Sequence, residues 1–361
     1  MKKMDKLLFF SVLILSFFGL LMVYSSSSIW AQYKFHDSFY YFKLQSVFLL
    51  IGIFLLYVVS QINYHYYEKY SKWILLGSFC LLILVLIPGI GSIRNGSRSW
   101  FGIGPLGIQP SEAAKISLII FTSKYLSKNS FESHSQISVL FPILMIMLLF
   151  FGLIMLQPDL GTGVILVMGV LAILFISGAY LKLFIGGGLL GLVGFILLIL
   201  IAPYRMKRIT SFLNPWKDEL GTGFQMIQSL YAIGPSGILG TGFLHSVQKH
   251  FYLPEPQTDF IFSIIAEEFG IVGAILVLSL YALILYRGIK ISISCDDLFG
   301  KYLSFGILFQ LLFQATMNLM VVVGLIPVTG VTLPFLSYGG SSLIISMFSI
   351  GVLLNISKKQ C

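Results

Sequence analysis

The feature of this sequence that most restricts its fold is a series of long apolar runs that recurs from one end to the other. A helix needs about twenty apolar residues to cross a bilayer. Runs of about this length lie at 7–24, 45–62, 73–90, 110–126, 139–157, 160–178, 183–202, 260–286, 302–325 and 340–356. Only 10% of the 361 residues are charged, whereas soluble domains carry about a quarter. The sequence therefore predicts an all-α polytopic integral membrane protein with about ten transmembrane helices.

Lysine and arginine in the short connections predict the orientation of these helices, because such residues concentrate on the cytoplasmic side. If the N-terminus is cytoplasmic, the inner segments hold most of the basic residues and the short outer loops hold only Lys34, Lys43, Arg94 and Arg98. Both termini are therefore predicted to be cytoplasmic. The long loop 203–259, between the seventh and eighth spans, is predicted to face outward. No soluble domain boundary is visible, so residues 1–361 are predicted to form a single membrane domain.

Composition also narrows the classes of ligand. The net charge of +9 fits anionic lipid headgroups or a phosphorylated substrate, and no soluble basic domain is present to bind nucleic acid. The five histidines and three cysteines have no metal-ligand spacing. Glycine loops of the nucleotide-binding kind are absent. The glycines at 186–188, 191 and 194 predict close helix packing rather than a ligand site.

The long loop ends in the sequence Tyr-Leu-Pro-Glu-Pro-Gln-Thr-Asp-Phe-Ile-Phe, residues 252–262. It places Asp259 where a helix is predicted to re-enter the bilayer, with Thr258 as the N-cap. An ionisable group at this boundary is a candidate functional residue. The alternative is that Asp259 only complements the positive end of the helix dipole, and local sequence alone favours that alternative.

Two acidic residues, Glu267 and Glu268, are predicted to lie deeper in the same helix. Carboxylates inside a bilayer need partners, because an unpaired charge there costs several kcal/mol. Lys115 is predicted to lie at a comparable depth in another helix, one turn below Glu112. We expect a Glu267–Lys115 ion pair that joins the two helices. The pair could be purely architectural or part of a substrate site.

Several outer basic residues are candidate contacts for a phosphorylated substrate, because guanidinium groups bind phosphate in a bidentate manner. Arg98 stands among glycines beside Trp100, while Arg205 and Lys249 lie in the long loop, and Arg205 would share a helix face with Arg208. The alternative for the loop residues is that they extend toward lipid headgroups. Asp159, after Pro158, is predicted to be a helix cap rather than a catalyst.

Taken together, these residues resemble the SEDS family (shape, elongation, division and sporulation), the FtsW/RodA/SpoVE proteins, and most closely the FtsW/SpoVE branch. The resemblance covers essentially the whole chain and rests on motifs that follow one another in the family's order. These motifs are Arg98 with Trp100, residues 109–112, 157–162, 228–229, 252–255, 258–262 with Glu267 and Glu268, and 334–342. The sequence departs from the family at Ser99, where many members have a second arginine, and at Pro256-Gln257, which replaces a pair containing histidine.

The resemblance implies a peptidoglycan glycosyltransferase of the bacterial cytoplasmic membrane, at the division or sporulation septum. Its substrate would be lipid II, a disaccharide-pentapeptide on undecaprenyl pyrophosphate. Its partners would be a class B penicillin-binding protein and other division or sporulation membrane proteins. Asp259 would be the catalytic base, and Arg98, Lys115, Glu267, Arg205 and Lys249 would contact substrate. No cofactor is certain, and a divalent cation at the pyrophosphate is left open. The alternatives are a lipid II flippase and a scaffold that only recruits the partner.

Overall fold

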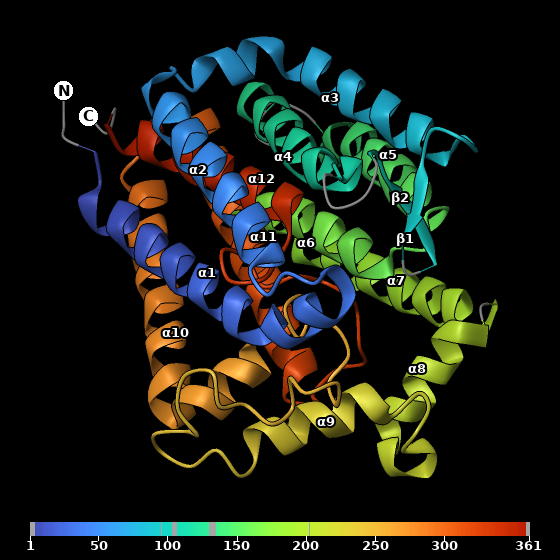
Figure 1. Cartoon of the computed structure of the whole chain (residues 1–361). Coiled ribbons are helices and arrows are strands. Elements are labelled where there is room, and N and C mark those ends of the chain that lie inside the picture. The colour runs from blue at the N-terminus through green and yellow to red at the C-terminus, as the bar shows by residue number, and fades with distance from the viewer. Residues whose placement is uncertain (1–3, 95, 103–106, 130–134, 202, 359–361) are drawn as a thin grey trace.

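The computed structural model describes residues 4–94, 96–102, 107–129, 135–201 and 203–358. Within these ranges the regular secondary structure is almost entirely helical (Figure 1). The helices are α1 Lys6–Phe35, α2 Tyr40–Gln61, α3 His65–Leu86, α4 Pro110–Lys128, α5 Gln136–Met155, α6 Leu160–Ile176, α7 Leu181–Ile201, α8 Pro203–Leu213, α9 Phe224–Ile233, α10 Ile261–Ile293, α11 Leu298–Val322 and α12 Gly340–Lys358. A short antiparallel hairpin joins β1 Ser92–Arg94 to β2 Ser97–Trp100, and a 3₁₀ turn covers Pro215–Asp218.

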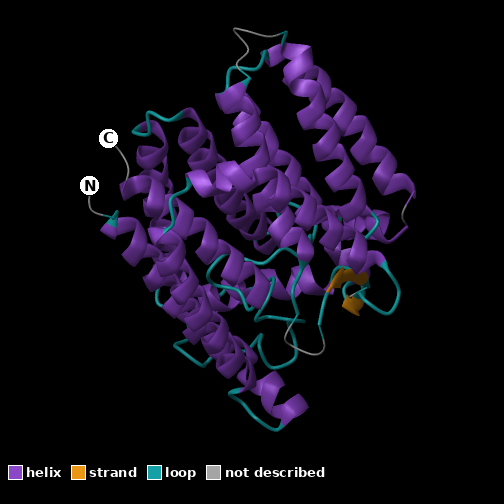
Figure 2. Ribbon diagram, turned by 90° about the horizontal axis from the view of Figure 1, so that it is seen from above, coloured by secondary structure: helices purple, strands orange, loops and turns teal. Residues whose placement is uncertain are grey.

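Seven described helices are long and apolar enough to cross a membrane, namely α1, α2, α3, α5, α10, α11 and α12. The remaining three predicted spans are also helical and correspond to α4, α6 and α7, of which α6 is apolar but shorter. The all-α membrane fold is therefore confirmed. The number of crossings and the sidedness stay predictions. The start of α1 and the end of α12 lie side by side at one end of the bundle (Figures 1 and 2), as an even number of crossings would require.

The first helix is longer than the apolar run that predicted it, because it continues through a row of serines after Tyr24. Serine usually weakens a helix by competing for backbone hydrogen bonds. Here Ser27 donates to the carbonyl of Val23 at 2.6 Å within the helix, while Ser25 donates to the carboxylate of Glu268 in α10. The polar end of α1 is thus stabilised by a partner from a distant part of the chain.

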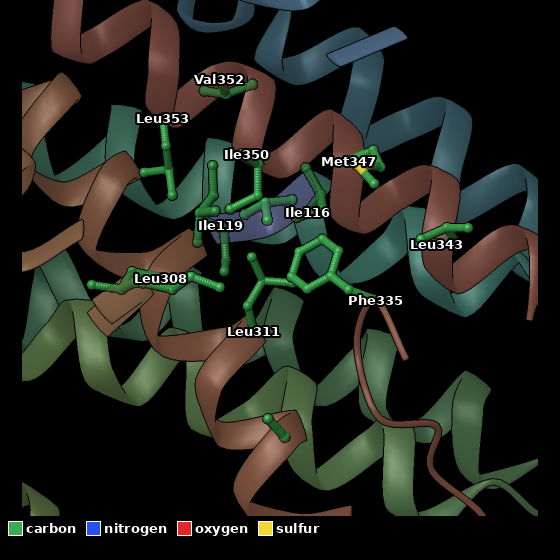
Figure 3. Packing of buried hydrophobic residues seen from close by; sticks show 14 of the residues in the cluster. Ile116, Ile119, Leu308, Leu311, Phe335, Leu343, Met347, Ile350, Val352 and Leu353 are labelled. Carbon is green, nitrogen blue, oxygen red and sulfur yellow. The ribbon is translucent and has the colours of Figure 1, made fainter. Parts of the chain in front are cut away.

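The core lies where α4, α11 and α12 meet. Figure 3 shows side chains of all three helices converging there, with Phe335 from the loop between α11 and α12 inserted among them. The same loop packs tightly on α1, since a Cβ at Gly19 would lie only 2.5 Å from the Phe335 carbonyl oxygen. The loop 323–339 is therefore part of the packed interior and can hold a site in fixed geometry.

One packing prediction was wrong. The α7 glycines were expected to let neighbouring helices approach closely, but an added Cβ at any of residues 186–188, 191 or 194 would meet nothing within 4 Å. Small residues permit close approach without enforcing it.

Candidate active site

Asp259 lies in the loop just before α10 rather than inside the first turn of that helix. The helix begins at Ile261 with Phe260 as its cap. Thr258, the predicted N-cap, instead directs its hydroxyl to the carbonyl of Glu255 at 3.0 Å. The prediction of the helix start was wrong because tertiary contacts hold the residues around Asp259 in a loop conformation.

These contacts come from α11 and the loop that follows it. The Asn318 side chain donates to the carbonyl of Asp259 at 2.8 Å and to the carbonyl of Val331 at 2.7 Å. The Ser337 hydroxyl donates to the Thr258 carbonyl at 2.6 Å. Asn318 therefore joins the Asp259 loop to the 323–339 loop. In that second loop, a Cβ on Gly330 would lie 3.8 Å from Oδ2 of Asp259, so the carboxylate faces Gly330.

The surroundings of Asp259 raise the pKa of its carboxyl to about 7. The main cause is burial, which disfavours the charged form, and the negative charges of Glu255 and Asp159 add to it. The positive charge of Arg208 opposes the rise. A carboxylate with a pKa near neutrality suits general base catalysis better than an ordinary aspartate does, because it is a stronger proton acceptor and is still substantially ionised at pH 7.

Arg208 belongs to α8 and points toward the same region. Its guanidinium donates to the carbonyl of Val328 at 3.0 Å. It also lines an open cleft of about 320 Å³, together with Ser211, Thr222, Gln225 and Pro254 among others. Pro254 belongs to the segment before Asp259 and Val328 to the 323–339 loop, whose Gly330 faces the carboxylate, although Asp259 is not among the residues that line the cleft. From the sequence, Arg208 was singled out only as a residue that would share a helix face with Arg205. The side chain of Arg205 is outside the described residues.

Lys115 does not pair with Glu267, so that prediction was wrong. The Lys115 ammonium donates to the Glu112 carboxylate at 2.9 Å and to Oε1 of Gln314 in α11 at 2.6 Å. The partner with the right spacing lies one turn away on the same helix face. The side chains of Glu112 and Lys115 are 8% and 4% exposed, so this ion pair is buried in the protein interior.

Glu267 and Lys249, predicted substrate contacts, also have partners inside the protein. The Glu267 carboxylate accepts hydrogen bonds from the backbone amide of Val247 at 2.7 Å and from the Ser246 hydroxyl. The Lys249 ammonium forms an ion pair with Glu268 at 2.9 Å. Both side chains are buried and paired within the protein, as is Lys115, so we do not propose any of the three as a substrate contact.

Two further residues singled out by the sequence, Asp159 and Arg98, have their main contacts elsewhere. Asp159 caps α6, as predicted, by accepting a hydrogen bond from the Thr162 amide at 3.1 Å, and Gln109 donates to its other oxygen at 3.0 Å. Arg98 is half-buried in β2, with its guanidinium 3.5 Å from the Leu86 carbonyl at the end of α3. The described charges that act on Asp259 come from Glu255, Arg208 and Asp159, not from Arg98. In the described residues, no group of three histidine, cysteine or acidic side chains is arranged to hold a metal ion.

Comparison with known proteins identifies the family. The model of the FtsW/RodA/SpoVE family, described as cell cycle protein, matches residues 5–361. This chain belongs to the FtsW/RodA/SpoVE family. It is 50% identical to the stage V sporulation protein E of Bacillus subtilis over 354 residues, which covers 98% of this chain and 97% of that protein. It is 41% identical to a probable peptidoglycan glycosyltransferase FtsW of Geobacter over 356 residues, covering 99% and 97%.

Two solved structures of the family share the fold along nearly the whole chain. One is a chain of a peptidoglycan synthase complex, with a TM-score of 0.81 and 33% identity over 99% of this chain and 98% of that one. The other is the rod shape determining protein RodA of Thermus thermophilus, with a TM-score of 0.73 and 28% identity over 99% and 97%. The arrangement of helices described above is therefore the arrangement of this family.

Proposed function

We propose that this protein is a peptidoglycan glycosyltransferase that polymerises lipid II on the outer side of the bacterial cytoplasmic membrane, with a class B penicillin-binding protein as partner. The septum of a dividing or sporulating cell is the proposed location. The naming of its FtsW relatives and the likeness to a chain of a peptidoglycan synthase complex support this proposal. The observation that carries it is the half-buried Asp259 carboxylate, with a pKa of about 7, in the loop just before the start of α10.

The proposed reaction needs one base and one group that stabilises the leaving charge. Asp259 accepts the proton of the acceptor sugar hydroxyl as its oxygen bonds to the anomeric carbon of the donor. The bond from that carbon to the undecaprenyl pyrophosphate breaks in the same displacement. A single displacement inverts the anomeric carbon and needs one carboxylate rather than the two of a retaining glycosidase. Arg208, in the adjacent cleft, is the described cation best placed to counter the pyrophosphate charge.

The decisive experiment is polymerisation of labelled lipid II by the purified protein with its penicillin-binding partner in proteoliposomes. Asp259→Asn should lower the rate by at least about 100-fold, since the amide cannot accept the proton. Asp37→Asn is the matched control, because Asp37 is an outer-face carboxylate whose partner is the exposed Lys43 at 2.7 Å. That control should polymerise at the normal rate. Normal polymerisation by Asp259→Asn would overturn the catalytic role of Asp259. Absence of polymerisation by the unmodified protein with its partner would favour the flippase alternative, which requires no base at this position.

A further inference from the structure

The helix that follows Asp259 is broken inside its predicted membrane span. At Gly270 the backbone has φ 61° and ψ −152°, a combination that essentially only glycine adopts. Gly270 follows Ile261 by about nine residues, which corresponds to about 14 Å along the helix axis. A backbone break at this depth requires other partners for the freed amides and carbonyls, because lipid provides none.

Residues 237–249 provide these partners, and we name them the inserted loop. In a continuous helix the amides of Ile271 and Val272 would donate to the carbonyls four residues earlier. Here they donate to the inserted loop, at 3.1 Å to Gly237 and 3.2 Å to Ile238. Figure 1 shows the yellow-to-orange part of the chain lying against the lower part of α10.

The carbonyls on the other side of the break are satisfied in the same way. The backbone amides of Thr241 and Gly242 donate to the backbone carbonyls of Glu267 and Glu268, each at 2.9 Å. The loop comes so close that a Cβ on Gly240 would lie 2.4 Å from the Glu268 backbone. The inserted loop therefore replaces two helical hydrogen bonds with four tertiary ones, and the outer segment of α10 is held by the loop as well as by the rest of the helix.

The end of the inserted loop is held by charged side chains. Lys249 forms its ion pair with Glu268 at 2.9 Å, and the Ser25 hydroxyl of α1 donates to the same carboxylate at 2.6 Å. The Lys249 ammonium is also 3.2 Å from the Ser25 hydroxyl. The side chains of Lys249 and Glu268 are 2% and 0% exposed. Removing one partner of such a pair leaves a buried, uncompensated charge.

The contacts among Lys249, Glu268 and Ser25 lie at the start of the segment that carries Asp259. Residues 250–258 connect Lys249 to Asp259, and the amide of the buried Leu253 donates to the Gln248 carbonyl at 2.9 Å. At its other end the segment is held by Asn318. The segment that carries Asp259 is thus held at one end by Asn318 of α11 and at the other by the contacts among Lys249, Glu268 and Ser25.

We propose that the Lys249–Glu268 pair, with Ser25, is a latch that positions Asp259 for catalysis. Both charged residues are positioning residues, because they act through the 250–258 segment and do not touch substrate. This proposal rests on the proposed function, since it assigns a role in turnover to a contact outside the catalytic cleft. Without the latch, the fold would persist while the carboxylate would occupy its catalytic position less of the time.

The test uses the neutral double variant Lys249→Met with Glu268→Gln, which removes both charges and leaves neither unpaired. In the proteoliposome assay we expect kcat to fall about tenfold or more, because small displacements of catalytic groups are costly. KM for lipid II should change less than about twofold, because the substrate-facing groups remain. Hydrogen exchange of the amides at 250–258 should become faster than in the unmodified protein.

The matched control is the ion pair between Asp5, the N-cap of α1, and Arg287 in the later part of α10, far along that helix from Glu268. Asp5 accepts a hydrogen bond from Nε of Arg287 at 2.9 Å. The neutral double variant Asp5→Asn with Arg287→Met should keep both kcat and the exchange rates of 250–258. If the first double variant fails to insert into the membrane, Ser25→Ala tests the latch with a smaller change and the same expected direction.

Unchanged kcat and unchanged exchange in the Lys249/Glu268 variant would overturn the latch. Equal losses of kcat in the two double variants would also overturn it, because they would indicate general loosening of α1 against α10. Failure of the proposed function is distinguishable, since it would appear as no polymerisation by the unmodified protein, and failure of the Asp259 assignment would appear as normal polymerisation by Asp259→Asn regardless of the latch variants.

Discussion

At the scale of single residues, the candidate site depends on one carboxylate placed between opposing influences. Burial and the charges of Glu255 and Asp159 raise the pKa of Asp259, and the charge of Arg208 lowers it. An aspartate with an ordinary pKa near 4 would be ionised at neutral pH but a weak base. The Asp259 carboxylate is therefore a stronger base, because burial limits the solvation of its charged form. The nearby Arg208 charge limits the rise in pKa, so the carboxyl still ionises near pH 7.

The pH dependence of polymerisation should follow this balance. Because the base acts in its ionised form and its pKa is about 7, the rate at limiting lipid II should rise about tenfold between pH 6 and pH 8. Arg208→Gln removes the charge that holds the pKa down, so the midpoint should move to higher pH. Lys207→Gln, at the exposed neighbouring position, should leave the midpoint in place. A midpoint near pH 4, or an acid shift in Arg208→Gln, would contradict this account.

The sequence drew attention to Asp259 and Asp159 but did not predict the partners of the charged residues. Asp259 and Asp159 were recognisable because proline, threonine and glycine beside them mark helix ends. The pairing of Lys115 was missed because depth along a helix can be estimated from residue number, whereas the direction of the neighbouring helix cannot. The Glu112–Lys115 spacing of three residues was the signal that favoured the observed pair.

At the scale of elements, α10 is the helix whose structure departs most from its sequence pattern. Its apolar run predicts one continuous span, and glycine is common in membrane helices, so Gly270 alone does not reveal a break. The break becomes understandable only with the inserted loop, which satisfies the freed backbone groups. Two adjacent carboxylates before a glycine, together with a distant glycine-rich loop, are the available signal. They do not specify which segment is inserted.

Gly270→Ala should be strongly destabilising. An alanine residue cannot adopt this backbone conformation without strain. Its Cβ would also lie 2.4 Å from the Ile238 carbonyl oxygen. We expect the free energy of unfolding to fall by at least about 2 kcal/mol, measured as a lower melting temperature in detergent. Gly77→Ala in α3 is the control, because an added Cβ there meets nothing within 4 Å. A Gly270→Ala protein as stable as this control would contradict the observed break.

At the scale of the whole molecule, the site is assembled from segments that are far apart in the sequence. Asp259, Arg208 and Gly330 come from three different segments of the chain, and the Asn318 side chain joins two of them. Hydropathy predicts the helices and their order, because membrane thickness fixes the length of each span. It carries no information about how the loops pack together. The fold class was therefore predictable from sequence, and the contacts around the carboxylate were not.

The orientation of the molecule is the remaining whole-molecule prediction, and the proposed reaction depends on it. In a variant with Cys80, Cys295 and Cys361 replaced by serine, Thr258→Cys should react with a membrane-impermeant maleimide in right-side-out vesicles. Lys290→Cys, exposed near the opposite end of α10, should react only in inverted vesicles. This pattern follows from the excess of basic residues in the predicted inner segments. Labelling of Thr258→Cys from the inner face alone would place the carboxylate on the cytoplasmic side, where it could not act on glycan exposed outside the cell.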